Sequence, residues 1–188
     1  ANETYISGAV TGQQLNFTLA TGTPLVGDTV TDDVTGGTAT VTNVQLSANK
    51  VYVKNVTGTF GMTNALTFDT GGSTSATGTV SGGGLEDQSG FTLIADGFDG
   101  EPLPGMSISI AGDSTSYVIQ SVSGTWAGTS SELVLVLAQE KVAGSADNAA
   151  IHLRKEYSQI RLTGHDFLSI GTGGVTTTNY PGTPSQPP

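Results

Sequence analysis

The sequence predicts an all-β protein built from two small tandem modules, each a β-sandwich or a β-barrel. Two observations lead to this fold class. Hydrophobic residues make up 36% of the 188 positions and charged residues only 12%, whereas the exposed faces of helices are normally rich in charged side chains. Several short stretches alternate apolar residues with Thr or Ser, as half-buried strands do, and 27 glycines punctuate the chain with turns.

The first module is predicted over residues 1–84. Gly27–Thr31 leads through a turn at Gly36–Gly37 to the alternating stretch Thr38–Val44, a pattern typical of a hairpin. Few large apolar side chains are available, so a unit of this size gains stability by associating with other chains. The expected core residues are Leu15, Phe17, Leu19, Val30, Val41, Val51, Val53, Phe60, Leu66 and Phe68.

The second module, predicted over residues 85–163, repeats this layout. Gly105–Ile110 leads through a turn to Tyr117–Val122, and the phrase Val122–Trp126 matches Val56–Phe60 of the first module. The continuous apolar run Leu133–Ala138 predicts a strand covered on both faces.

The segment Ala149–Tyr157 fits either a helix or a strand, and the alternation of Ile151 and Leu153 favours a strand.

A Gly-rich linker is expected between the modules at Ser81–Gly84, because consecutive glycines have little tendency to order. Residues 164–188 are expected to form a junction segment followed by an extended Pro-rich stretch, since proline favours extended chain. We expect the chain to be a fragment of a longer polypeptide.

Charge and composition exclude several functional classes. The net charge is −10 with only six Lys and Arg, which argues against nucleic-acid binding, because phosphates are bound by clustered cations. Lys141, Arg154, Lys155 and Arg161 form one late basic strip, which either pairs with acidic residues of a neighbouring chain or is simply a solvated strand face. There are no cysteines, and no apolar run is long enough to span a membrane.

No catalytic residues are predicted. His152 and His165 are the only imidazole bases, and the adjacent pair His165 and Asp166 cannot form a relay on an extended strand, where neighbours point to opposite faces. We expect both to make structural hydrogen bonds. The chain is therefore predicted not to be an enzyme and to need no cofactor.

Two acidic clusters are candidates for calcium, because this ion takes several oxygen ligands from a tight loop. The first is Asp96, Asp99 and Glu101, and the second is Asp28, Asp32 and Asp33. The alternative for both is an ordinary acidic β-turn, and no metal site is predicted outright.

Trp126, the only tryptophan, is a candidate for stacking on a sugar ring. The alternative is that it closes the core of its module, as Phe60 would in the first.

The stretch from Ser158 to Gly182, with weaker support from Gly27–Thr31 and Val56–Phe60, resembles large virion structural proteins of T4-like marine bacteriophages (cyanophage-like), of the tail-fibre and baseplate type. The resemblance implies a virion component that acts in assembly or display. Its partners would be other virion proteins and copies of itself, with a trimer favoured. The predicted interaction residues are Ile160, Arg161, His165, Asp166, Phe167 and Tyr180.

Two alternatives remain open at this point. One is a receptor- or glycan-binding module, such as a phage tip with a host surface glycan as its partner. The other is a bacterial secreted adhesin, which would be extracellular or on the cell surface.

Overall fold

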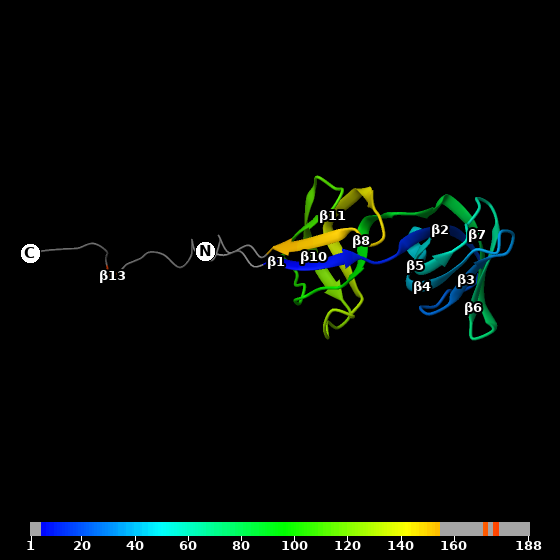
Figure 1. Cartoon of the computed structure of the whole chain (residues 1–188), viewed down its shortest axis with the longest axis horizontal. Coiled ribbons are helices and arrows are strands. Elements are labelled where there is room, and N and C mark those ends of the chain that lie inside the picture. Colours follow the sequence, from blue (N-terminus) through cyan, green and yellow to red (C-terminus); the bar gives the residue numbers. More distant parts are fainter. Residues whose placement is uncertain (1–4, 155–170, 173–174, 177–188) are drawn as a thin grey trace, which may run out of the picture. The chain divides into compact units, whose positions relative to one another are not determined.

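The computed structural model describes residues 5–154, 171–172 and 175–176, and it confirms the all-β fold with two small modules. The chain divides into the units Ala1–Arg154 and Lys155–Pro188. In the described part of the first unit, twelve strands form two closed antiparallel barrels of six strands each (Figure 1). Of the two architectures that the sequence allowed, the barrel is therefore the one that forms.

One barrel, here called the inserted barrel, is built from consecutive strands. They are β2 (Gln13–Gly22), β3 (Thr29–Asp32), β4 (Thr38–Gln45), β5 (Lys50–Thr57), β6 (Ala65–Thr70) and β7 (Ser73–Glu86), with a 3₁₀ turn at Leu46–Ala48. Of the ten predicted core residues, eight are fully buried, while Leu19 and Phe60 are half-buried against the same core. The rings of Phe17 and Phe68 lie 5.2 Å apart, centroid to centroid.

The other barrel, here called the host barrel, is interrupted by the inserted one. Its strands are β1 (Tyr5–Val10), β8 (Gln88–Asp96), β9 (Ser107–Ile110), β10 (Ser116–Ser123), β11 (Leu133–Ser145) and β12 (Ala150–Arg154). On β9, Ile108 and Ile110 are buried and the alternating Ser107 and Ser109 are not, as period-two alternation predicts.

Both strand predictions in the host barrel are confirmed where the structure describes them. Residues 150–154 of the ambiguous segment are strand β12, and Leu133 to Leu137 begin strand β11. The three leucines of β11 are fully buried, but Val134 and Val136 are only half-buried, so its outer face is partly covered rather than closed.

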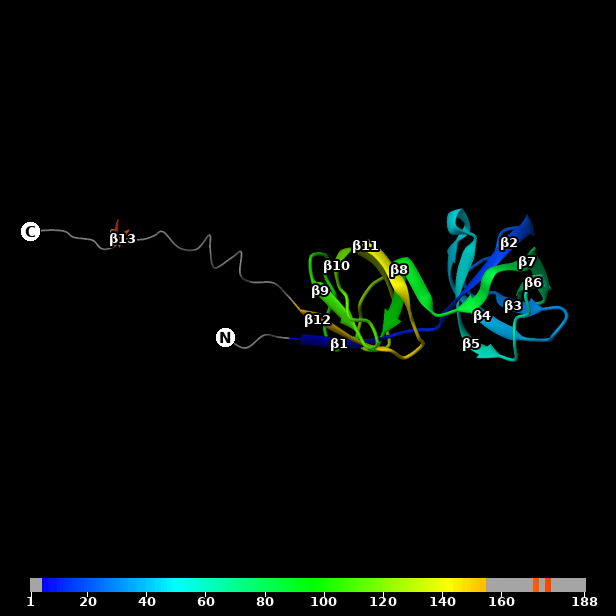
Figure 2. The same ribbon diagram turned by 90° about the horizontal axis from the view of Figure 1, so that it is seen from above.

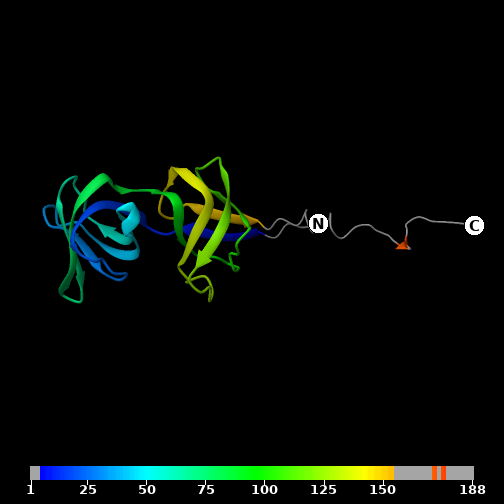
Figure 3. The same cartoon turned by 180° about the vertical axis from the view of Figure 1, so that it is seen from behind.

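The two barrels share one strand order, but the host barrel is circularly permuted. Reading around each barrel, β2-β5-β4-β3-β6-β7 corresponds to β8-β11-β10-β9-β12-β1. The sixth position is held by β7 in one barrel and by the N-terminal strand β1 in the other. Tyr5 therefore pairs with Arg154, and Figures 2 and 3 show β1 beside β12. The predicted division at residue 84 thus falls near the end of β7, two residues before that strand ends at Glu86. It also leaves β1 with the first group of strands, although β1 pairs with the second.

The permutation explains why the repeat is only partly in register. The hairpins β3–β4 and β9–β10 are equivalent, as their similar sequences suggest. The matching phrases are not equivalent, because Val56–Phe60 begins at the end of β5 whereas Val122–Trp126 begins at the end of β10, and these two strands hold different positions in their barrels.

The glycines of the expected linker belong to strand β7. Ser81–Gly84 lies in a bulge, where the step from Val80 to Leu85 faces the shorter step from Phe17 to Leu15 on β2. Gly82 and Gly84 have φ of 56° and 75°, which glycine adopts without strain and other residues do not. The prediction of a flexible linker is therefore wrong: these glycines lie inside strand β7, and the main-chain oxygen of Gly84 accepts from the side-chain amide of Asn16 at 3.3 Å. The chain passes between the barrels at Asp87.

In the second unit the structure describes two short paired strands, β13 (Gly171–Thr172) and β14 (Val175–Thr176). The remainder of the predicted junction segment and Pro-rich stretch lies outside the described residues.

Candidate functional site

The acidic cluster around Asp32 organises loops of the inserted barrel. Asp32 is fully buried, and its carboxylate accepts hydrogen bonds from the backbone N–H groups of Val34, Thr35 and Gly61 at 2.8 to 2.9 Å. The side-chain amide of Asn64 donates to both carboxylate oxygens, at 3.0 and 2.9 Å. Burial alone would raise the pKa of Asp32, but these hydrogen bonds outweigh it and lower the pKa to about 2.

Asp28 has the same role at the other end of strand β3. It is fully buried and accepts hydrogen bonds from the N–H of Leu25, at 2.8 Å, and from the hydroxyls of Thr70 and Ser75. Burial opposes ionisation here too, yet the hydrogen bonds lower its pKa. Asp33 is exposed and accepts from Thr67. The oxygens of this cluster are used by protein donors, which is the turn-capping alternative to calcium.

The first calcium candidate is also spread along loops. Asp99 exchanges hydrogen bonds with the backbone of Ser7, while Asp96 ends strand β8 opposite Ala9 and Glu101 is exposed. The described residues contain no group of three or more His, Asp or Glu side chains placed to hold a metal ion.

Trp126 is half-buried against the core of the host barrel. Its indole N–H donates to the main-chain oxygen of Phe98 at 3.1 Å. This is the position of a core-closing side chain, and Phe60 packs similarly on the inserted barrel.

The six predicted interaction residues, Ile160, Arg161, His165, Asp166, Phe167 and Tyr180, lie outside the described residues. Of the late basic strip, Lys141 and Arg154 are described, and they lie in different surroundings. Lys141 is 1% exposed and lies 3.8 Å from a carboxylate oxygen of Asp113, which also accepts from Tyr117 at 2.7 Å. Burial lowers the pKa of Lys141, and this lysine is part of the barrel interior rather than of a basic surface.

The two barrels are joined by a buried hydrogen-bond network around Gln88. Its side-chain amide donates to the main-chain oxygens of Thr11, at 2.7 Å, and Gly12, at 3.2 Å, and its side-chain oxygen accepts from the N–H of Ile94 at 2.8 Å. Thr11 and Gly12 carry the chain from β1 to β2, and Gln88 stands where it returns from β7 to β8. One fully buried side chain therefore ties both crossings together.

Further contacts run from the inserted barrel to strand β8. Tyr52 donates its hydroxyl to the main-chain oxygen of Thr92 at 3.2 Å, and Gln45 donates to the hydroxyl of Thr92 at 2.6 Å. Lys50 donates to the main-chain oxygen of Ser89 on β8 at 3.3 Å and, within the inserted barrel, to the side-chain oxygen of Gln14 at 3.0 Å. Burial raises the pKa of Tyr52 to about 12 and lowers the pKa of Lys50. We call this set of contacts, with those of Gln88, the junction.

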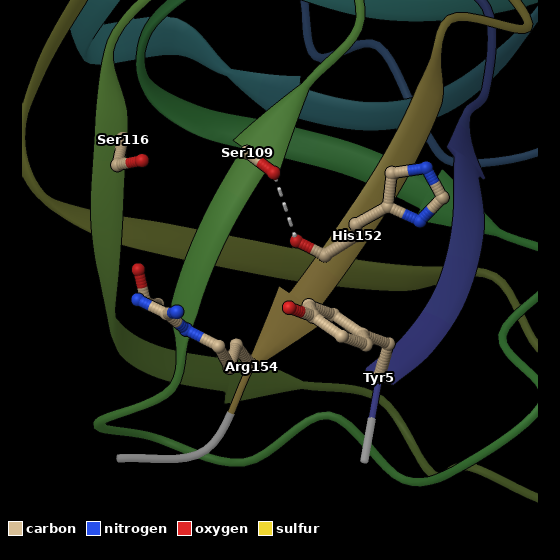
Figure 4. A pocket seen from close by; sticks show the side chains of 6 residues that line it. Tyr5, Ser109, Ser116, His152 and Arg154 are labelled. Carbon is tan, nitrogen blue, oxygen red and sulfur yellow. Dashed lines mark hydrogen bonds between the residues drawn. The ribbon is translucent and has the colours of Figure 1, made fainter. Parts of the chain in front are cut away.

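A polar pocket of about 250 Å³ lies on the outer surface of the host barrel. It spans β1, β12, β9 and β10, and its lining residues are Tyr5, Ser107, Ser109, Ser116, His152 and Arg154 (Figure 4).

Strand register explains why these six residues meet. Tyr5 pairs with Arg154 and Arg154 with Ser107, while His152 pairs with Ser109 and Ser109 with Ser116. The residues between them on β9 and β12 are buried in the barrel core, so the lining side chains point outwards. The serines are small, and the hollow lies above them beside the larger side chains of β1 and β12.

The imidazole of His152 does not face the serine hydroxyls of the pocket. The hydroxyl of Ser109 donates to the main-chain oxygen of His152 at 3.5 Å, and Figure 4 shows the imidazole pointing away from both Ser109 and Ser116. The Tyr5 ring, 55% exposed, extends from β1 towards Arg154, whose side chain extends over the serine side. The sequence singled out His152 and Arg154 for other reasons and missed Tyr5 and the serines, because β1, the hairpin β9–β10 and β12 are far apart along the chain.

The described residues contain no helix that is long and apolar enough to cross a membrane. No protein-family model, curated protein or solved structure matches the chain.

Proposed function

We propose that the chain is a structural component of a phage virion, in a tail fibre, baseplate or related appendage, and that it acts in assembly or display. The observation that supports this most is the junction. A spacer in such an appendage must keep its modules in a fixed relation under load, and a flexible tether between the barrels would not do so.

The junction resists bending in two ways. The chain crosses between the barrels twice, through Thr11 and Gly12 and again at Asp87, so a hinge would have to move both crossings together. The carbonyl oxygens of the first crossing are held by Gln88, whose side chain is inaccessible to water. Opening the junction would exchange these hydrogen bonds for hydrogen bonds to water, and each such exchange costs about 0.5 to 1.5 kcal/mol.

The predicted partners are other virion proteins and further copies of the chain, with a trimer favoured. The six interaction residues of the second unit remain the predicted contacts.

Two measurements test this proposal. Antibodies raised against the chain should label the tail or baseplate of phage particles whose genome encodes it, and its peptides should occur in purified virions at a fixed ratio to a tail protein. Occurrence only in the culture medium or on bacterial cells would favour the adhesin alternative. Light scattering should give three times 19.0 kDa, and a monomer at micromolar concentration would contradict self-association.

A second candidate function is recognition of a host surface glycan, and the pocket favours it. It offers an exposed aromatic ring beside several hydroxyl groups, which suits the mixed apolar and polar surface of a sugar. Tyr5, rather than the half-buried Trp126, is then the stacking residue. Binding of the chain to the host surface polysaccharide, and its loss in Tyr5→Ala, would support recognition, whereas equal binding by the variant would place recognition elsewhere.

A further inference from the structure

The host barrel depends on a strand from outside its own continuous segment. Strands β8 to β12 follow one another from Gln88 to Arg154, whereas the sixth strand, β1, precedes the whole inserted barrel. It fills the space between β12 and β8, here called the slot, with five residue pairs on the first side and two on the second. Without β1 the barrel would have two open strand edges, which pair readily with another strand.

The slot fits the sequence of β1 closely. Val10 is buried in the core of the host barrel, and Gly8 lies against Phe98, where a Cβ would come within 2.4 Å of a ring carbon. On the side towards β8, the N–H of Ser7 donates to the carboxylate of Asp99 at 2.9 Å, and the N–H of Asp99 donates to the main-chain oxygen of Ser7 at 3.1 Å. The slot therefore takes a strand with glycine at its centre and an apolar residue at its end, as β1 has.

These contacts are the same whichever copy of the chain supplies β1. Strand β1 and the inserted barrel form one block, and β8 to β12 form another, and the two blocks are joined along the chain only through Asp87, between Glu86 and Gln88. If the first block comes from one copy and the second from another, the contacts of the slot and of the junction are all kept. Only the crossing at Asp87 and the bulge before it must change, so exchange between copies loses few contacts.

The Gly-rich bulge of β7 supplies the length that such an exchange needs. The five positions from Val80 to Leu85 face only two on β2, so three residues are extra. Pulled straight, three residues span about 10 Å, at 3.3 Å for each. Gly82 and Gly84 have positive φ, and glycine leaves that region of φ without a steric barrier from a Cβ. A crossing of one residue beside this spare length is the kind of short hinge at which copies exchange elements.

We propose that strand β1 of one copy completes the host barrel of another copy, with the Gly-rich bulge and Asp87 as the hinge. Each copy then gives its own β1 and inserted barrel to one neighbour and receives those of another, which joins the copies in a closed ring. The junction is kept, but its two sides come from different chains. This inference rests on the self-association predicted under the proposed function, and it adds the element that joins the copies.

A pair of introduced cysteines tests the exchange, because the chain has none of its own. Ser7 on β1 lies opposite His152 on β12, and the backbone groups of Ser7 bond to Asp99 instead of β12. Such a non-hydrogen-bonded pair has its Cα atoms about 4.5 Å apart, which a disulfide can bridge. After mild oxidation, we expect Ser7→Cys/His152→Cys to migrate mainly at two or three times 19.0 kDa without reductant, and at 19.0 kDa with it.

Ser109→Cys/Ser116→Cys is the matched control. It links β9 to β10, which belong to the same copy with or without exchange. This pair is also non-hydrogen-bonded, because Ile119 donates to the main-chain oxygen of Met106 three positions along and the two kinds of pair alternate. We expect a single band at 19.0 kDa without reductant. If the control forms multimers to the same extent, the cross-links come from collisions between molecules and the inference is overturned.

Mixing two single variants gives a second measurement, which does not depend on the double variant. Ser7→Cys and His152→Cys are unfolded together in urea, refolded and oxidised. Exchange predicts a disulfide between the two different variants, identified by mass spectrometry of the linked peptides, because β1 of one then lies beside β12 of the other. The mixture of Ser109→Cys with Ser116→Cys should give no such product.

The outcomes separate exchange from self-association. If the double variant forms its disulfide within one chain and the mixed variants form none, β1 stays in its own barrel and the inference is overturned. If light scattering nevertheless gives an oligomer, the copies associate through other surfaces and the proposed function stands. If light scattering gives a monomer, the predicted self-association fails together with the exchange.

Discussion

Replacing Asp32 with asparagine should destabilise the protein by about 2 to 3 kcal/mol at pH 7. The carboxylate is fully buried and its pKa falls from 3.8 to about 2 on folding. A difference of nearly two pKa units between the unfolded and folded states corresponds to this free energy, at 1.36 kcal/mol for each unit. Asparagine keeps the shape, but it removes the charge that the donors from Thr35 and Gly61 stabilise and turns an NH₂ group towards one of the surrounding donors.

The pH dependence has a definite sign. Because the folded state lowers the pKa, the stabilisation by Asp32 is fully present above pH 4 and is lost as the pH falls towards 2. About half should remain near pH 3. The measurement is urea unfolding of the wild type and Asp32→Asn, followed by far-UV circular dichroism, from pH 7 down to pH 2. The difference between their free energies of unfolding should shrink over this range. The other carboxylates contribute equally to the pH dependence of both proteins, so their contributions cancel in the difference between the two free energies of unfolding.

The neighbouring Asp33 provides the control. It is exposed, so Asp33→Asn should change the free energy of unfolding by no more than about 0.5 kcal/mol at any pH in this range. The reasoning is refuted if Asp32→Asn costs no more than Asp33→Asn at pH 7, or if its cost is the same at pH 2 as at pH 7.

Three further changes test other parts of the fold. Lys141→Met should destabilise by about 3 kcal/mol in urea unfolding, because it leaves the buried partner carboxylate without its cation, and an unchanged midpoint would show that the pair is not coupled. Gly12→Ala should cost clearly more than Gly27→Ala in thermal unfolding: both glycines have positive φ, but a Cβ at Gly12 collides with a carbonyl oxygen of β5 whereas Gly27 has open space. Equal losses of stability in the two variants would mean that the backbone strain of a positive φ, and not the collision, determines the effect. A circular permutant that joins Arg154 to Tyr5 by an Asn-Gly turn, with new ends in the exposed turn between β6 and β7, should fold with an unchanged circular dichroism spectrum, and aggregation or loss of signal would contradict the pairing of β1 with β12.

Local patterns predicted much of this fold. The alternation of Ile108 and Ile110 with serines, and the apolar side chains of the first module, correctly identified strands and most of the core of the inserted barrel. These signals are local, since each depends on residues two apart along one strand.

The features that the sequence did not reveal depend on contacts between distant residues. Nothing within Tyr5–Val10 shows that it pairs with β12 rather than with the strands that follow it. Consecutive glycines such as those in Ser81–Gly84 predict a flexible linker, yet they lie in a strand whose residues on either side, Val80 and Leu85, pair with β2. The pocket could not be predicted for the same reason: Tyr5 and Arg154 become neighbours only through the pairing of β1 with β12 in the folded barrel.

The acidic clusters show a different limit. The sequence placed Asp28, Asp32 and Asp33 together, but it could not say which carboxylates turn inwards. Asp32 ends strand β3 on its buried face, where the loops after it supply N–H donors, whereas Asp33 turns outwards. In the sequence, a carboxylate that binds calcium cannot be told from one that caps a loop, because the distinction depends on where the backbone N–H donors lie in the folded structure.

The most direct test of the proposed structural role is whether the junction makes the two barrels unfold together. Trp126 reports on the host barrel alone, and Asp32 lies in the inserted barrel. We predict that Asp32→Asn moves the urea midpoint of Trp126 fluorescence as far as it moves the midpoint of far-UV circular dichroism, so that the two transitions coincide in both proteins. If the Trp126 midpoint stays at the wild-type value while the circular dichroism transition splits in two, the barrels are independent and the rigid-spacer account is contradicted.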